Sequence, residues 1–231
     1  HGTSRRQRQM CIRDSYKRWV MVRKKNKSLP KIESVIPKLN SEVTKEEVIA
    51  ISKDYQFEMK NYDFTAAGSD LVFEDYKIDE KINHIDGITV EEAEHMMATK
   101  LYQNNAKVHF NHFVEKGGRF GKRIVYGGHV ISLTRSISFN GLSNAFKIIA
   151  INGGTHASPC FAGKTVFAWS KIIEKVDVSD TLGALRIRTN GLGDAQPYQF
   201  QHQDQNGKFN SDVLLSLDYL SLIHISEPTR L

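Results

Sequence analysis

The spacing of apolar residues predicts a first helix that ends near Tyr102. The apolar residues recur at helical intervals, at Val90, Ala93, Met96, Met97 and Leu101. Thr89 stands three residues before Glu92, which is the spacing of a capping box, so we expect the helix to begin here. The segment 73–84 before it is typical of extended chain.

A second helix is predicted to open at Gly127-Gly128 and to end near Asn140-Gly141. Its apolar face consists of Val130, Ile131, Leu133 and Ile137, with Thr134 beside them. Between the two helices we expect a polar loop, 103–121, and a short strand, 123–126.

Four segments with the character of strands follow the second helix, separated by Gly, Pro, Asp and Asn: 145–152, 165–176, 182–189 and 213–219. Helices followed by strands favour an α+β fold over alternating βαβ units. A long helix wrapped by an antiparallel sheet would bury the apolar face of residues 130–137.

The N-terminal part of the chain has a different character. Residues 16–25 read as a strand followed by a basic run. Residues 26–60, which contain Pro30 and Pro37, are expected to be a linker, and residues 61–219 a domain. The strand at 16–25 would then be the last strand of a preceding unit that is cut short.

Both ends of the chain resemble translated adapter DNA. Residues 10–15 read MCIRDS and residues 220–226 read LSLIHIS, and these two peptides are encoded by opposite strands of one inverted repeat. We therefore expect residues 1–15 and 220–231 to be adapter-derived and to lie outside the natural fold.

Composition is that of a globular protein, with 40% hydrophobic and 25% charged residues. Half of the formal charge of +6 comes from residues 1–15, which weakens the case for a nucleic-acid-binding module. Outside these ends Cys160 is the single cysteine, which excludes an internal disulfide. The chain has no run of 18 apolar residues and no visible secretory signal, so we expect a cytoplasmic protein.

Two places offer candidate chemistry. His109 follows the first helix in a polar stretch and is a candidate general acid or base, with Asn104 able to orient water or a carbonyl. Gly127 and Gly128 open a helix, where free amides and a close approach to the backbone suit an oxyanion. A solvent-exposed loop and an ordinary turn are the structural alternatives.

Other residues carry weaker signals. Arg119, Lys122 and Arg123 are candidate contacts for phosphates, although a solvated basic edge explains them too. The histidines show no metal-binding spacing such as H-E-x-x-H, so no metal is expected. Cys160 has no C-x-x-C partner and is expected to pack in the core.

Several stretches together resemble the mesaconyl-CoA hydratase family of MaoC-like proteins, in the family's order along most of residues 16–219. They read YKRWVMVRK, IDGITVEEAEHMMATKLYQNNAKVHFN, GRFGKRIVYGG, YGGHVISLTRSISFNGLSNAFKIIAINGGTHASPCFAGKTVFAWSKI and LGALRIRT. The resemblance implies a double hot dog, in which two tandem units each wrap a curved antiparallel sheet around a long helix. Residues 61–219 would be the second unit, and the reaction the reversible addition of water to mesaconyl-CoA, giving β-methylmalyl-CoA.

The resemblance also assigns roles to residues. The wider R-specific hydratases carry an Asp-x-Asn-Pro-x-His motif, which matches Asn104, Ala106, Lys107 and His109 here. The histidine is kept, but asparagine replaces the aspartate and cannot act as a base, so His109 would move protons and Asn104 would orient water or the thioester. A second acid or base would have to come from the preceding unit.

The family's His-Gly pair matches Tyr126-Gly127. The amide of Gly127, helped by Gly128, would bind the thioester oxygen, and His129 is an alternative contact for the free carboxylate. The resemblance implies a CoA thioester as substrate, no metal or redox cofactor, no nucleic acid or membrane partner, glyoxylate assimilation as the setting, and a homo-oligomer formed through the sheets.

Two other functions remain open. A hot-dog thioesterase needs a carboxylate on the second helix, and residues 130–140 contain none. A non-catalytic half that only binds CoA is favoured by Asn104 in place of aspartate.

Overall fold

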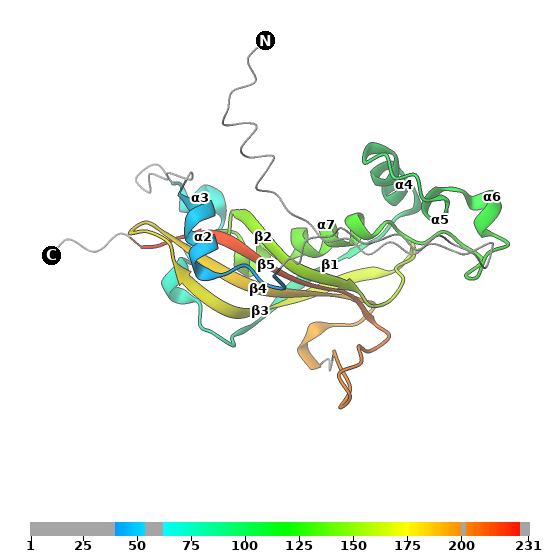
Figure 1. Ribbon diagram of the computed structural model, residues 1–231. Coiled ribbons are helices and arrows are strands. Elements are labelled where there is room, and N and C mark those ends of the chain that lie inside the picture. The colour runs from blue at the N-terminus through cyan, green and yellow to red at the C-terminus, as the bar shows by residue number, and fades with distance from the viewer. Residues whose placement is uncertain (1–39, 54–61, 200–201, 227–231) are drawn as a thin grey trace, which may run out of the picture. The chain divides into compact units, whose positions relative to one another are not determined.

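The structure is a computed structural model that describes residues 40–53, 62–199 and 202–226 (Figure 1). The chain divides into two compact units, His1–Glu42 and Val43–Leu231, and only residues 40–42 of the first are described. The following description therefore concerns the second unit. The predicted strand at 16–25 and the predicted adapter-derived residues 1–15 and 227–231 lie outside the described residues.

The second unit is built on a five-stranded antiparallel sheet (Figure 1). Its order across the sheet is β1 (Lys81–Thr89), β3 (Thr165–Asp177), β4 (Leu182–Gly193), β5 (Val213–His224) and β2 (Lys147–His156). The central strands β4 and β5 are buried along almost their whole length. They can therefore be apolar on both faces, whereas the edge strands β1 and β2 carry more exposed positions.

The helix α7 (Gly127–Ile137) lies on one face of this sheet and contacts β1, β3, β4 and β5. Val130, Leu133 and Ile137 are one helical face and are buried with the inner positions of the strands. A short helix, α8 (Phe139–Leu142), follows and contains a kink at Asn140 and Gly141, where Gly141 has φ of 99°, a conformation that favours glycine. The predicted helix is confirmed, but α7 ends at Ile137, three residues before the predicted end at Asn140-Gly141.

The opposite face of the sheet is covered at one end by α2 (Lys45–Ser52). Val48 of α2 is buried with Val176, Ala184, Leu220 and Leu222. Because neighbouring residues of a strand point to opposite faces, these positions alternate with those that meet α7. The prediction of a linker through residue 60 is therefore wrong for residues 45–52, a helix whose start Thr44 and Glu47 stabilise with a capping box.

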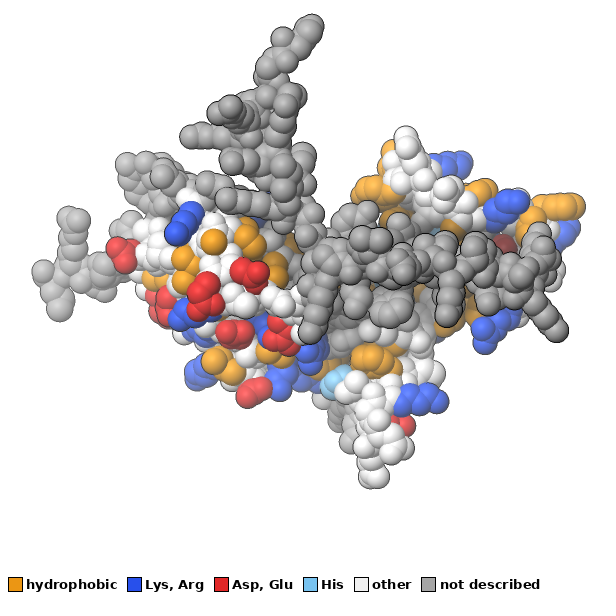
Figure 2. Space-filling model, in the orientation of Figure 1, with side chains coloured by type: hydrophobic (Ala, Val, Ile, Leu, Met, Phe, Trp, Pro, Cys, Tyr) orange, Lys and Arg blue, Asp and Glu red, His pale blue; other side chains and the backbone are white. Residues whose placement is uncertain are grey.

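The remaining elements are short. They are α3 (Phe64–Ala67), η2 (Phe73–Asp75), α4 (Glu92–Leu101), α5 (Lys107–Phe110), α6 (His112–Glu115) and η3 (Pro197–Gln199). Figure 2 shows apolar and basic side chains together at the end of the unit where α4 to α6 lie. Met97, Leu101 and Phe113 are exposed there.

The region before α7 departs from the predicted secondary structure. Thr89 belongs to β1, where its hydroxyl lies 2.8 Å from that of Thr165, so it does not cap α4. The amide of Glu91 instead donates to the Glu94 carboxylate at the start of the helix. Residues 123–126 form no strand, and α5 and α6 occupy the predicted loop.

The buried face of α4 also differs from the prediction. His95, Ala98 and Thr99 are buried, whereas Met97 is 62% and Leu101 is 72% exposed. Helical spacing therefore predicted the helix but not its orientation, since polar side chains fill the interface with α7.

A row of polar side chains crosses the core beneath α7. The carbonyl of Asn140 accepts from Nδ1 of His84 at 2.6 Å, so Nε2 of the neutral ring accepts from Ser170 at 2.8 Å. Ser170 in turn pairs with Thr189 at 2.8 Å, and Thr189 with Tyr219 at 3.2 Å. Burial lowers the pKa of His84, which keeps its ring neutral and fixes the direction of every bond.

The last described strand includes residues expected to lie outside the fold. β5 continues to His224, and Leu220, Leu222 and Ile223 are at most 2% exposed. Their alternation continues that of the preceding residues, with Leu222 packed near α2 and Ile223 in the core beneath α7. The predicted boundary at residue 219 is therefore wrong for the fold, and an adapter origin of residues 220–226 stays a prediction.

Among the helices of the described segments, none is long and apolar enough to span a lipid bilayer.

Candidate active site

The candidate site is centred on the first turn of α7. The amides of His129 and Val130 both donate to the carbonyl of Tyr126, at 2.9 and 3.2 Å. The amides of Gly127 and Gly128 precede them and have no acceptor in the described part of the chain, as is usual for the first residues of a helix. Together with the helix dipole, these two amides can bind a negatively charged oxygen.

Both glycines lie directly against aromatic side chains. A Cβ atom at Gly127 would lie 2.7 Å from Nε2 of His156, and one at Gly128 would lie 2.6 Å from the ring of Tyr126. A side chain at either position would therefore collide with an aromatic ring. The absence of Cβ atoms lets Tyr126 and His156 approach the helix end closely.

His109, on α5, faces this region from the side of Tyr126. Its ring meets that of Tyr126 edge to face, with centroids 5.8 Å apart and an angle of 61°. Nδ1 of His109 donates to the carbonyl of Ile124 at 2.9 Å, because a carbonyl can only accept. Nε2 is therefore the atom that can take a proton when the ring is neutral and give it back when the ring is charged.

Asn104 shapes the turn that carries His109. Its Oδ1 accepts from the amide of Ala106 at 2.9 Å, and its own amide donates to the carbonyl of Thr99 at 3.0 Å. Asn104 thus connects the end of α4 to the start of α5 through an Asx turn. This leaves its side-chain NH₂ group as the donor for the predicted contact with water or thioester.

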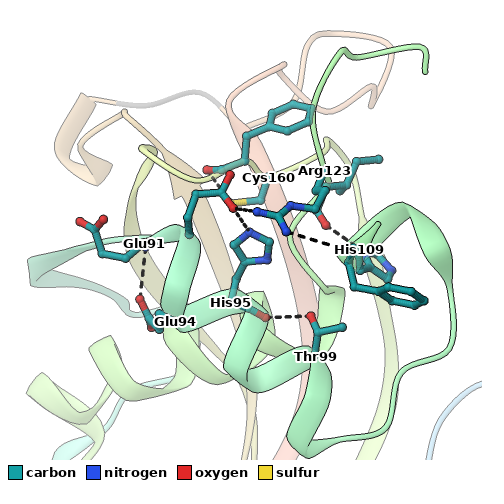
Figure 3. A network of polar contacts seen from close by, with 11 residues as sticks. Glu91, Glu94, His95, Thr99, His109, Arg123 and Cys160 are labelled. Carbon is teal, nitrogen blue, oxygen red and sulfur yellow. Dashed lines mark hydrogen bonds and ion pairs between the residues drawn. The ribbon is translucent and has the colours of Figure 1, made fainter. Parts of the chain in front are cut away.

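An ion-pair network joins α4 to the chain before α7 (Figure 3). The guanidinium of Arg123 donates to the carboxylate of Glu92 and, at 3.5 Å, to the carbonyl of Phe110. The same carboxylate lies 3.1 Å from Nε2 of His95, which is fully buried. Burial lowers the pKa of His95, so its ring is neutral and donates to Glu92.

The side chain of His129 contacts Glu94 of α4. It is buried on α7, and its Nε2 is 3.1 Å from a carboxylate oxygen of Glu94. A carboxylate already occupies this position, so a second one from a substrate would be repelled. The predicted contact of His129 with a free carboxylate therefore has no support in this geometry.

The basic residues of the predicted phosphate site are divided. Arg123 is ion-paired with Glu92, whereas Arg119 and Lys122 are exposed to solvent. The guanidinium of Arg119 lies 5.0 Å from the ring centroid of Phe120, and Nζ of Lys122 lies 4.4 Å from that of Phe161. These two rings pack against each other, with centroids 5.4 Å apart.

Cys160 is buried, as expected, and burial raises the pKa of its thiol to about 11. It is therefore a core residue and not a nucleophile. Across residues 40–53, 62–199 and 202–226, no group of three or more His, Cys, Asp or Glu side chains is placed to hold a metal ion.

His156, which no sequence pattern indicated, lies at the end of β2 against Gly127. It follows Gly127 by 29 positions, and no local motif surrounds it. Its place at the site results from the pairing of β2 with β5, where His156 faces Leu215, and from the course of α7 over the sheet.

Comparison with known proteins shows similarity along most of the chain. It is 49% identical over 210 residues to a protein named beta-methylmalyl-CoA dehydratase from Chloroflexus aurantiacus. It is 46% identical over 211 residues to a mesaconyl-CoA hydratase from Cereibacter sphaeroides. Each match covers 90% of this chain but 59% of the relative, so the chain spans less than two thirds of either protein. No family model matches the chain.

Solved structures agree in fold. A MaoC domain protein dehydratase from Chloroflexus aurantiacus superposes with a TM-score of 0.83 at 48% identity, over 90% of this chain and 59% of that one. A MaoC-like dehydratase from Rhodospirillum rubrum has a TM-score of 0.53 at 15% identity, over 68% of this chain and 99% of that one. The latter shows the shared fold alone. The predicted hot-dog fold is confirmed, and along 90% of its length the chain is similar to a beta-methylmalyl-CoA dehydratase, a mesaconyl-CoA hydratase and a MaoC domain dehydratase.

Proposed function

We propose that the protein to which this chain belongs is a hydro-lyase that interconverts mesaconyl-CoA and β-methylmalyl-CoA by reversible loss and addition of water. The observation that carries the proposal is the similarity, over 90% of this chain, to two relatives named for these substrates. The geometry at α7 supports it, because free amides and an imidazole lie together there.

The first turn of α7 would bind the thioester. A carbonyl oxygen placed at the amides of Gly127 and Gly128 accepts hydrogen bonds that strengthen as negative charge develops on it. The carbon next to the carbonyl then becomes acidic, because the enolate that forms on loss of its proton is stabilised. Such a site favours chemistry at the two carbons beside a thioester.

His109 would transfer a proton. The hydrogen bond from Nδ1 to the carbonyl of Ile124 orients the ring and leaves Nε2 for the substrate. In the direction of hydration, Nε2 takes a proton from the attacking water, and in the direction of dehydration it returns one to the departing hydroxyl. Asn104 holds the turn that carries His109 and offers its NH₂ group to water or the thioester.

The rest of the substrate would extend along the surface beside α5 and α6. Arg119 and Lys122 are the cationic candidates for the phosphates of CoA, since Arg123 is ion-paired with Glu92. This chemistry uses no metal or redox cofactor in our proposal. A homo-oligomer formed through sheet edges also stays a proposal, with β2 as the candidate edge because it pairs with β5 alone among the described strands.

The test is a hydration assay that follows the enoyl-thioester absorbance of mesaconyl-CoA, with a thiol reagent in a parallel sample. The Chloroflexus dehydratase is the positive control. Loss of absorbance without release of CoA supports the hydro-lyase. Release of CoA would instead indicate a thioesterase, although the Glu94 carboxylate, which contacts His129 of α7, is already held by His129 and the Glu91 amide. Binding of CoA thioester without turnover would indicate a non-catalytic half.

A further inference from the structure

A second imidazole, that of His156, lies against the first residue of α7. Nε2 and Cε1 of His156 are 2.7 and 2.9 Å from the position of a Cβ atom at Gly127. His156 therefore touches the residue whose amide is proposed to hold the thioester oxygen. His109 reaches the same turn indirectly, through the ring of Tyr126.

The backbone holds His156 firmly in this place. It is the last residue of β2 and pairs with Leu215 of β5. The next amide, that of Ala157, donates to the carbonyl of Leu214 at 3.1 Å and continues the pairing. An imidazole on a sheet strand is positioned more accurately than one on a loop.

The side chain of His156 has no structural role that accounts for it. Within the described residues, neither ring nitrogen has a hydrogen-bond partner, in contrast to His84, His95 and His109. His156 is an exposed residue, but the protein packed around its ring, at Gly127 among other places, is enough for desolvation to lower its pKa. Near neutral pH the ring is therefore uncharged and able to accept a proton.

We infer that His156 is the second proton-transfer residue of the hydro-lyase, serving the carbon next to the thioester while His109 serves the carbon that carries the hydroxyl. The inference rests on the proposed function. Its geometric basis is proximity to Gly127: the carbon next to the thioester is bonded directly to the carbonyl carbon, and the hydroxyl-bearing carbon is one bond farther away.

In the direction of dehydration, Nε2 of His156 takes the proton from the carbon next to the thioester. The electrons of that C–H bond form the enolate, whose oxygen is held by the amide of Gly127. As the carbonyl re-forms, the carbon–carbon double bond forms and the carbon–oxygen bond breaks. The departing hydroxide takes a proton from the protonated His109 and leaves as water. Exchange with solvent then returns both rings to their starting states.

This assignment removes the need for a base at position 104. Asparagine there cannot accept a proton, which otherwise leaves the chain with one acid–base residue for a reaction that requires two. His156 supplies the second from within the chain. It replaces the expectation that this group comes from a preceding unit.

The experiment compares His156→Gln, His109→Gln and, as a control, His112→Gln, an exposed histidine on α6. Two rates are measured on β-methylmalyl-CoA: dehydration, and exchange with D₂O of the proton next to the thioester. His156→Gln is expected to slow both rates by about 10²-fold or more. His109→Gln is expected to slow dehydration while leaving exchange faster than in His156→Gln, and the control to retain both rates.

Dehydration by His156→Gln within about threefold of the unaltered rate, well below the usual effect of a lost general base, would overturn the inference. The inference would also be overturned if His109→Gln abolished the exchange with D₂O and His156→Gln left it intact. The two histidines would then have each other's roles. Circular dichroism of each variant tests whether the sheet is intact.

A second measurement separates this inference from the proposed function. If the unaltered protein does not dehydrate β-methylmalyl-CoA, the proposed function fails. A saturated, unreactive acyl-CoA is then added, and the NMR signals of the His156 ring and the Gly127 amide are followed. Shifts of both NMR signals would support the placement of His156 in the thioester site. A shift at Gly127 alone, or no shift at either, overturns the placement of His156.

Discussion

Nη1 of Arg135, on α7, donates to the hydroxyl of Tyr219, on β5, at 3.1 Å, and the guanidinium also lies 5.1 Å from the centroid of the same ring. The same nitrogen donates to Ser138 at 2.7 Å. This contact attaches the central helix to the polar row that crosses the core. The Tyr219 hydroxyl is therefore shared by the helix and by Thr189.

We expect Tyr219→Phe to lower the free energy of unfolding by about 1–3 kcal/mol, since it leaves buried polar partners unsatisfied. Tyr219 is fully buried, whereas Tyr198 is 57% exposed and provides the matched control as Tyr198→Phe. Urea unfolding of both variants measures the effect. Equal stability of the two would show that the hydroxyl of Tyr219 is not needed.

His109→Ala should reduce turnover by about 10²-fold or more, the usual effect of losing a general acid or base. The fold should remain, because the His109 ring is only partly buried and makes one hydrogen bond, to Ile124. The hydration assay measures the rate and circular dichroism the fold. A folded variant with nearly normal turnover would exclude His109 from the chemistry.

Gly127→Ala should reduce turnover by at least about tenfold, because the added methyl group displaces His156 and crowds the oxyanion site. Gly153→Ala is the control. Gly153 lies on β2, the strand that also carries His156, and a Cβ atom there meets nothing within 4 Å. The double variant Gly127→Ala/His156→Ala should regain thermal stability lost in the single variant, but not activity. Full activity of Gly127→Ala would mean that the helix end does not approach the substrate.

Stability should fall as the pH drops from about 6.5 towards 4. Burial lowers the pKa of His84 and lowers that of His224 to about 4. Above the ordinary pKa of 6.5, these two histidines are neutral in both the folded and the unfolded chain, so they make stability independent of pH there. Below it the unfolded chain binds protons that the folded chain does not, at a cost of up to about 1.4 kcal/mol per pH unit for each histidine.

Urea unfolding between pH 7 and 4.5 measures this dependence. His84→Asn should be less stable throughout and should show a shallower slope, because one of the proton-linked groups is gone. A protein that is as stable at pH 5 as at pH 7 would contradict the neutral, buried state of these rings.

The sequence predicted most of the sheet and its central helix because both have regular apolar patterns. Thr165–Asp177 differs from its predicted range by one residue, and Gly127–Ile137 begins where predicted but ends three residues before Asn140. It failed where polar residues are buried or apolar ones exposed. His95 and Thr99 face the core while Met97 does not, and no periodicity rule anticipates this arrangement.

The candidate site was predicted only as far as its parts are local in sequence. Tyr126, Gly127 and Gly128 are adjacent, and the resemblance to known hydratases identified His109. His156 could not be found this way, since its contact with Gly127 depends on how β2, β5 and α7 assemble. The ion pair of Arg123 with Glu92 likewise joins residues separated by 31 positions.

The polar row from His84 to Tyr219 has a consequence for how the strands find one another during folding. Each of its members lies on a different strand, β1, β3, β4 or β5, and each bond needs its partner on the inner face. A slip of one residue in any pairing would turn one member outward and leave its neighbours buried without partners. The Leu, Ile and Val side chains of this sheet are similar enough to pack in more than one register. The row of hydrogen bonds, in contrast, can form only in the native register.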